Sequence, residues 1–144
     1  MHGFNRISRL FLKGGMLAAS ALCLGACGNY AVYKLAVNTS PKSADGFSRG
    51  DIASCTVTIT DENGGPVLTG YPFPGDSNTH GCTPGNTQEY IGTFSYSTAR
   101  TSGKLNFQVD AFNANKGTLQ TGQTGLIAAQ AFPPEVTIPT LTIK

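Results

Sequence analysis

SCTVTIT, residues 54–60, is the stretch that decides the fold class of this chain. Its cysteine, valine and isoleucine fall on one face of an extended backbone and its threonines fall on the other. The following residues, Asp61–Gly65 (DENGG), tolerate positive φ and favour a tight turn. We therefore predict a strand with one buried face, a turn, and a short returning strand at Val67–Gly70.

Similar short runs continue along the chain, separated by clusters of Gly, Pro, Asn and Ser. We expect further strands at Tyr30–Val37, Glu89–Ser97, Lys104–Phe112, Thr118–Thr121, Gly125–Ala131 and Glu135–Lys144. The last run has two apolar pairs out of phase at Pro139-Thr140, which favours a β-bulge in an edge strand. No helical pattern of useful length follows residue 27. The chain is therefore predicted to be all-β, an antiparallel β-sandwich of about seven or eight strands, with a small barrel as the alternative.

A loose motif near the end of the chain agrees with a sandwich. The run FQVDAFNANKGTLQTGQTG, residues 107–125, resembles the closing strands of bacterial immunoglobulin-like and transthyretin-like modules. The matching positions are Phe112, Gly117, Leu119 and Gly122. The chain has no tryptophan, which marks antibody-type domains, so the resemblance implies the architecture alone.

The N-terminal segment has the order of a bacterial secretion signal. A cationic start is followed by an uncharged stretch, residues 16–26, which is too short for a membrane span of about 20 residues. The basic residues are Arg6, Arg9 and Lys13. The stretch ends in Leu24-Gly25-Ala26-Cys27, which resembles the cleavage box of bacterial lipoproteins.

That resemblance implies a processing event and a domain division. A lipoprotein signal peptide, residues 1–26, would be removed, and Cys27 would carry the lipid. Residues 27–29 would then be the anchor and a short spacer, and residues 30–144 a single domain. An ordinary secretory signal cut near Ala26, which would leave Cys27 as a free thiol, is the alternative.

Charge excludes one class of partner. The whole chain has ten Lys and Arg against eight Asp and Glu, but the first 26 residues contain three of the bases and none of the acids. The remaining 118 residues have seven bases and eight acids, a net charge near −1. We therefore expect no nucleic-acid partner.

Two cysteines remain for pairing once Cys27 is assigned to the lipid. In an oxidising compartment we expect Cys55 and Cys82 to form a disulfide. A thiol or metal site built from His80 and Cys82, with Asp76 nearby, is the alternative, but its spacing matches no structural zinc pattern. We expect no metal and no cofactor.

The sequence contains no recognisable catalytic constellation. No Gly-x-Ser-x-Gly motif occurs, and only one histidine, His80, follows the signal segment. Asp61 begins a sequence like a calcium loop, but Pro72 stands where the bidentate glutamate belongs, which favours a simple turn. Tyr71 and Phe73 are the candidate partner-binding residues, because they form an aromatic pair in a proline-stiffened segment. We expect a protein that is not an enzyme.

These observations predict a lipid-anchored protein of the bacterial cell envelope that binds a partner or supports an assembly. Gly28 in place of aspartate favours the outer membrane, because the resemblance associates aspartate there with inner-membrane retention. The expected partners are the membrane, through the anchor, and a nearby envelope protein or a second copy. The alternative is an inhibitor or sequestering protein for a periplasmic or secreted enzyme that inserts the long loop Tyr71–Gln88.

Overall fold

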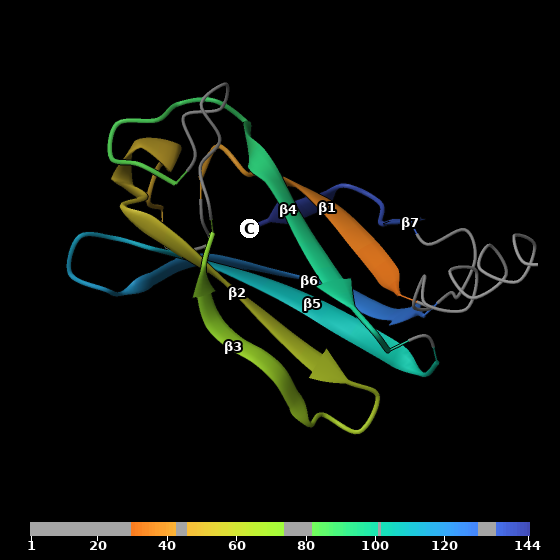
Figure 1. Cartoon of the computed structure of the whole chain (residues 1–144). Helices are drawn as coiled ribbons and strands as arrows, with labels where there is room; N and C mark the ends of the chain where they lie inside the picture. The colour runs from red at the N-terminus through yellow and green to blue at the C-terminus, as the bar shows by residue number, and fades with distance from the viewer. Residues whose placement is uncertain (1–29, 43–45, 74–81, 101, 130–134) are drawn as a thin grey trace, which may run out of the picture.

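The computed structural model describes residues 30–42, 46–73, 82–100, 102–129 and 135–144 (Figure 1). The predicted signal peptide, the predicted lipidation site Cys27 and the predicted spacer all lie outside these residues. The elements along the chain are β1 (Ala31–Thr39), a 3₁₀ turn (Arg49–Asp51), β2 (Ser54–Asp61), β3 (Pro66–Pro72), β4 (Tyr90–Thr98), β5 (Lys104–Phe112), β6 (Thr118–Ala128), β7 (Glu135–Thr137) and β8 (Leu141–Ile143).

The strands form two sheets that pack face to face (Figure 1). One has the order β4-β1-β7, with β8 also pairing with β1, and the other has the order β3-β2-β5-β6. The predicted all-β sandwich is therefore confirmed.

Strict alternation in the three central strands builds the core. Strands β1, β2 and β5 bury every second residue and leave the others partly or fully exposed. The fully enclosed side chains come from both sheets, so the core is the layer between them. They include Tyr33, Leu35, Val37, Val57, Ile59, Leu105, Phe107 and Val109.

The C-terminal run differs from the single bulged antiparallel strand that the sequence predicts. It divides into β7 and β8, and both pair with β1 in the parallel direction. Pro139 lies at the break, where it has no N–H to give to a ladder. Just before it, the Ile138 amide still donates to the Lys34 carbonyl at 3.2 Å.

Two further differences from the sequence prediction concern β6 and β3. The two weak strands predicted at Thr118–Thr121 and Gly125–Ala131 are one strand, β6, which absorbs an irregularity at Gly125 with a φ of +73°. Strand β3 extends to Pro72, so Tyr71 belongs to a strand and not to a loop.

The two sides of the sandwich are closed differently. On one side, β6 and β8 meet through two backbone hydrogen bonds between Thr121 and Lys144, each 3.1 Å long. Gly122 permits this approach, because a Cβ there would lie 3.0 Å from an Ile143 methyl carbon. On the other side, β3 and β4 approach through side chains, with the Tyr71 and Phe94 ring centroids 6.0 Å apart. We call this second side the β3–β4 seam.

Candidate functional site

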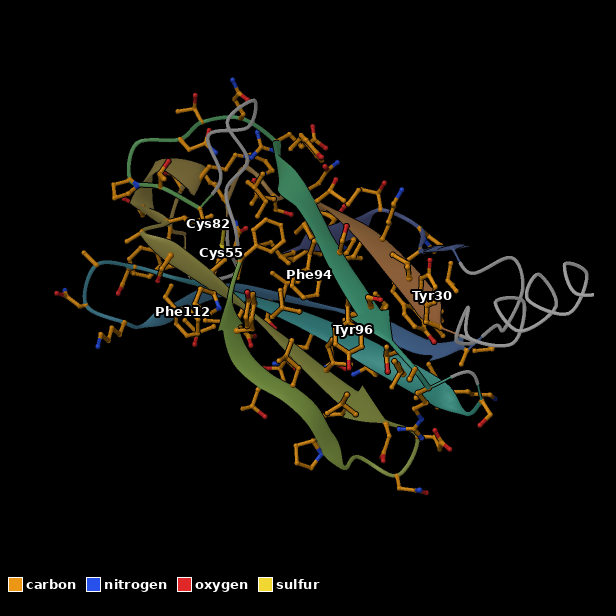
Figure 2. All side chains as sticks on the ribbon, in the orientation of Figure 1. Tyr30, Cys55, Cys82, Phe94, Tyr96 and Phe112 are labelled. Atoms are coloured by element: carbon orange, nitrogen blue, oxygen red, sulfur yellow. A yellow bond between two sulfur atoms is a disulfide. The ribbon has the colours of Figure 1, made fainter. Side chains whose placement is uncertain are left out.

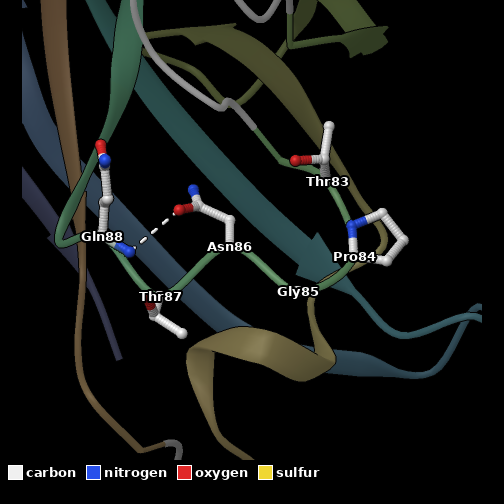
Figure 3. A pocket seen from close by; sticks show the side chains of 6 residues that line it. All are labelled: Thr83, Pro84, Gly85, Asn86, Thr87 and Gln88. Atoms are coloured by element: carbon white, nitrogen blue, oxygen red, sulfur yellow. Dashed lines mark hydrogen bonds between the residues drawn. The ribbon is translucent and has the colours of Figure 1, made fainter.

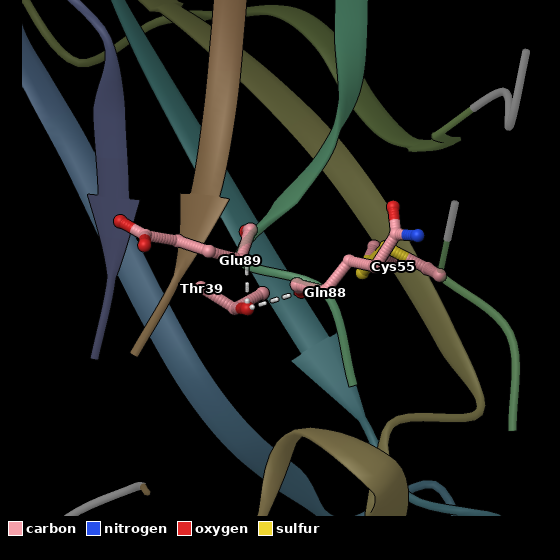
Figure 4. The surroundings of a disulfide bond; sticks show 5 residues. Thr39, Cys55, Gln88 and Glu89 are labelled. Atoms are coloured by element: carbon pink, nitrogen blue, oxygen red, sulfur yellow. Dashed lines mark hydrogen bonds between the residues drawn. A yellow bond between two sulfur atoms is a disulfide. The ribbon is translucent and has the colours of Figure 1, made fainter. Parts of the chain in front are cut away.

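The predicted disulfide is present and joins β2 to the segment that leads into β4 in the other sheet (Figure 4). Cys55 is 4 % exposed on the inner face of β2, and Cys82 begins the segment that leads into β4. Their Cα atoms lie 5.5 Å apart, within the usual range for a disulfide. This confirms the Cys55–Cys82 pairing.

Thr39, at the end of β1, organises the backbone beside the disulfide. Its hydroxyl donates to the carbonyls of Gln88 and Glu89, at 3.4 and 3.2 Å (Figure 4). Its own carbonyl accepts two hydrogen bonds from the Arg49 guanidinium, at 3.2 and 2.7 Å. These contacts hold the entry to β4 against the end of β1.

The segment between Cys82 and β4 forms a hollow of about 260 Å³ (Figure 3). Its lining residues are Thr83, Pro84, Gly85, Asn86, Thr87 and Gln88. The Asn86 side-chain oxygen accepts a hydrogen bond from the Gln88 amide at 2.9 Å, and the Gly85 amide donates to the Gly50 carbonyl. The lining is polar but carries no ionisable group, so this hollow offers hydrogen bonds and no acid or base.

The structure separates the two candidate partner-binding aromatics. Tyr71 is 49 % exposed on β3, whereas Phe73 is 6 % exposed and packs in the core. The Phe73 amide donates to the Cys55 carbonyl at 2.9 Å, which continues the β2–β3 pairing past Pro72 and turns the ring inward. Of the two predicted partner-binding residues, the structure therefore leaves Tyr71 at the surface and places Phe73 in the core.

The turn after β2 has the geometry of a tight turn. The Asp61 carboxylate accepts hydrogen bonds from the amides of Asn63 and Gly65, at 3.0 and 2.8 Å. Gly64 adopts a φ of +78° within it. The favoured turn interpretation agrees with this geometry, because backbone donors occupy the carboxylate oxygen that a calcium ion would need.

Within this turn, Glu62 contacts the connection between β4 and β5, which the sequence alone did not place beside it. Its carboxylate accepts a hydrogen bond from the Lys104 amide at 2.8 Å and lies 3.3 Å from the Arg100 guanidinium. The Lys104 backbone hydrogen bond is the main reason that the pKa of Glu62 lies below its usual range. Arg100 also approaches Asp61 at 3.8 Å.

We expect this carboxylate to make folding stability depend on pH. The pKa of Glu62 is lower in the folded protein than in the unfolded chain. The contribution of Glu62 to folding stability is therefore present above the unfolded pKa and is lost as pH falls through the folded pKa. Glu62→Gln should therefore lower the unfolding midpoint at neutral pH, with the difference shrinking in acid. Thermal unfolding between neutral and acidic pH measures this. Glu89→Gln, which removes another exposed carboxylate, is the control, and equal pH profiles for the two variants would contradict the assignment.

On the outer face of the β3-β2-β5-β6 sheet, Asp110 belongs to a polar network. Its carboxylate accepts hydrogen bonds from the Gln108 side-chain Nε2 at 3.0 and 2.9 Å and from the Thr121 hydroxyl at 2.6 Å. Gln123 extends the network by donating to Gln108 at 2.9 Å. These side chains satisfy one another, and the registers Asp110–Thr121 and Gln108–Gln123 bring them together.

The alternative metal site falls on residues outside the described structure. His80 and Asp76 lie there, so their relation to the disulfide is not described. Within the described ranges, no group of three or more His, Cys, Asp or Glu side chains is placed to hold a metal ion. No helix of the described chain is long and apolar enough to cross a membrane.

Comparison with known proteins adds no assignment. No family model, curated protein or solved structure matches the chain.

Proposed function

We propose that the chain is a lipid-anchored protein of the bacterial cell envelope whose β-sandwich binds a partner and catalyses no reaction. The observation that carries this proposal is Leu24-Gly25-Ala26-Cys27 at the end of an uncharged stretch with a basic start. A domain whose first strand begins at Ala31 follows almost at once.

A feature of the folded domain supports the proposed location in the cell envelope. The Cys55–Cys82 disulfide is the kind of bond that persists in oxidising compartments such as the bacterial periplasm. The anchor also limits reach, because three residues between Cys27 and Ala31 span about 10 Å at most when extended. The proposed partner is therefore a neighbour in or near the same membrane, and the exposed Tyr71 ring is its candidate contact.

Processing at Cys27 is the first test. In bacteria, the intact mass of the membrane-bound protein should show loss of residues 1–26 and a gain of acyl chains. Cys27→Ser should accumulate as an unprocessed precursor, because the lipid is attached through the cysteine sulfur. Cys23→Ser, which changes a cysteine within the signal, should be processed like the unaltered protein. A Cys27→Ser protein that is cleaved normally and released in soluble form would contradict the proposal.

Crosslinking in the same membranes tests the kind of partner. A binding module of the envelope should crosslink to envelope proteins or to its own copies. Capture of a single periplasmic or secreted hydrolase, with inhibition of that enzyme by the purified chain, would instead favour the inhibitor.

A further inference from the structure

In the described part of the chain, three of the four edges of the two sheets are protected against pairing with another chain. Strand β3 begins at Pro66 and ends at Pro72, and Gly70 twists it with a φ of +59°. Strands β7 and β8 are three residues each and are separated by Pro139. Strand β6 is tied to Lys144 by backbone hydrogen bonds. Short strands, prolines, bulges and covering segments are the usual means of preventing edge-to-edge association.

Strand β4 has none of these protections along most of its length. Its nine residues, YIGTFSYST, include no proline and no charged residue. Its pairing with β1 is regular from Thr93 to Thr98, and the one register shift lies near Gly92, which has a φ of +145°. In the described part of the chain, β1 is the only strand that pairs with β4. Among the described residues, one edge of β4 therefore presents backbone groups that pair with no strand, beside small exposed side chains.

The side of the sandwich next to this edge is incompletely covered. Along the β3–β4 seam, Val67, Leu68 and Tyr96 are only partly buried, and Tyr71 is 49 % exposed beside Phe94. Figure 2 shows Phe94 and Tyr96 projecting from β4 toward the opposite sheet. A strand added to β4 would extend its sheet over this seam and remove apolar surface from water.

The charges that flank β4 favour a second copy in the antiparallel direction. Glu89 precedes the strand and Arg100 follows it. Antiparallel pairing of two copies about the middle of β4 brings Glu89 of each close to Arg100 of the other, whereas parallel pairing places like charges together. Both side chains already have partners within the chain, Asn38 for Glu89 and Glu62 for Arg100, but Arg100 remains 34 % exposed.

We propose that the protein forms a symmetric dimer through antiparallel β4–β4 pairing, with the two-fold axis near Ser95. In each copy, the sheet that contains β4 then joins its counterpart in the other copy, and the two form one continuous sheet. The pairing does not depend on the lipid anchor. With the anchor present, the starts of the two β1 strands, each opposite Thr98, lie about 20 Å apart along the strand direction. Both anchors reach one membrane when the strands lie along its surface.

Single cysteines on the exposed face of β4 test the geometry. Thr93→Cys, Ser95→Cys and Ser97→Cys, each in the full chain under oxidising conditions, are compared on non-reducing gels. In an antiparallel two-fold pair only the central residue lies next to its own copy. Ser95→Cys should therefore give the most covalent dimer and its neighbours several-fold less. Equal crosslinking at all three positions would indicate parallel pairing, and crosslinking at none would indicate no β4 contact. Either result overturns the proposal.

A charge substitution tests the same contact without added cysteines. Ser95→Lys places two like charges together at the centre of the pair and should convert the detergent-solubilised protein from dimer to monomer by mass measurement. Thr69→Lys, at an exposed position of β3, is the matched control and should remain dimeric. Unchanged thermal unfolding of both variants shows that they fold. An unaltered protein that is monomeric throughout, or a Ser95→Lys variant that stays dimeric, overturns the proposal.

Discussion

Replacing Phe107 with alanine is expected to lower the free energy of unfolding by about 3–5 kcal/mol. Phe107 is 0 % exposed, and its ring centroid lies 5.2 Å from that of Tyr33 and 6.4 Å from that of Tyr96. The substitution leaves a cavity where β5 faces β1 and β4. Because domains of this size are stable by about 5–15 kcal/mol, the loss is a large fraction of the total. Urea unfolding followed by circular dichroism measures it.

Tyr33→Phe is the matched control for Phe107→Ala. The Tyr33 hydroxyl is buried and has no hydrogen-bond partner among the described residues, and this burial raises the pKa of Tyr33. An unpaired buried hydroxyl costs about 1–3 kcal/mol, so its removal should leave stability unchanged or increase it. A Phe107→Ala variant as stable as the unaltered protein would contradict the assignment of Phe107 to the centre of the core.

Loss of the disulfide is the second change with a large expected effect, about 2–5 kcal/mol. The bond connects Cys55 in one sheet to the segment that enters β4 in the other, across a separation of 27 residues. In the chain-entropy model a closed loop of that length contributes about 3–4 kcal/mol by restricting the unfolded chain. The thermal unfolding midpoint, measured with and without reductant, reports the loss.

Replacing the two cysteines one at a time separates the stability that the disulfide provides from the stability that core packing provides. Cys55 is 4 % exposed, so replacing it also removes buried surface, whereas Cys82 is only partly buried. Cys82→Ala should therefore match the reduced protein, and Cys55→Ala should be less stable than either. A midpoint that does not change when the bond is reduced would show that the folded chain does not depend on it.

The sequence by itself determined that the chain is built from strands and which face of the most regular ones is buried. In residues 54–60 and 104–112, apolar side chains recur at every second position, and the structure buries those positions in β2 and β5. Asp61–Gly65 was recognisable as a turn because it combines an aspartate with consecutive glycines. The cysteine pairing followed from a count of the cysteines left after Cys27. Each of these features depends on local chemistry or on composition.

Only the tertiary structure decided which strands are neighbours and which surfaces remain open. Alternation specifies the buried face of a strand but not its partner, since backbone hydrogen bonds are alike for every strand. The parallel pairing of β7 and β8 with β1, the burial of Phe73 with Tyr71 exposed, and the contact of Glu62 with Lys104 all join residues far apart in the chain. The same reason explains the edge of β4. Its nine residues contain no proline and no charge, but its place at the end of a sheet is set by the packing of the whole domain.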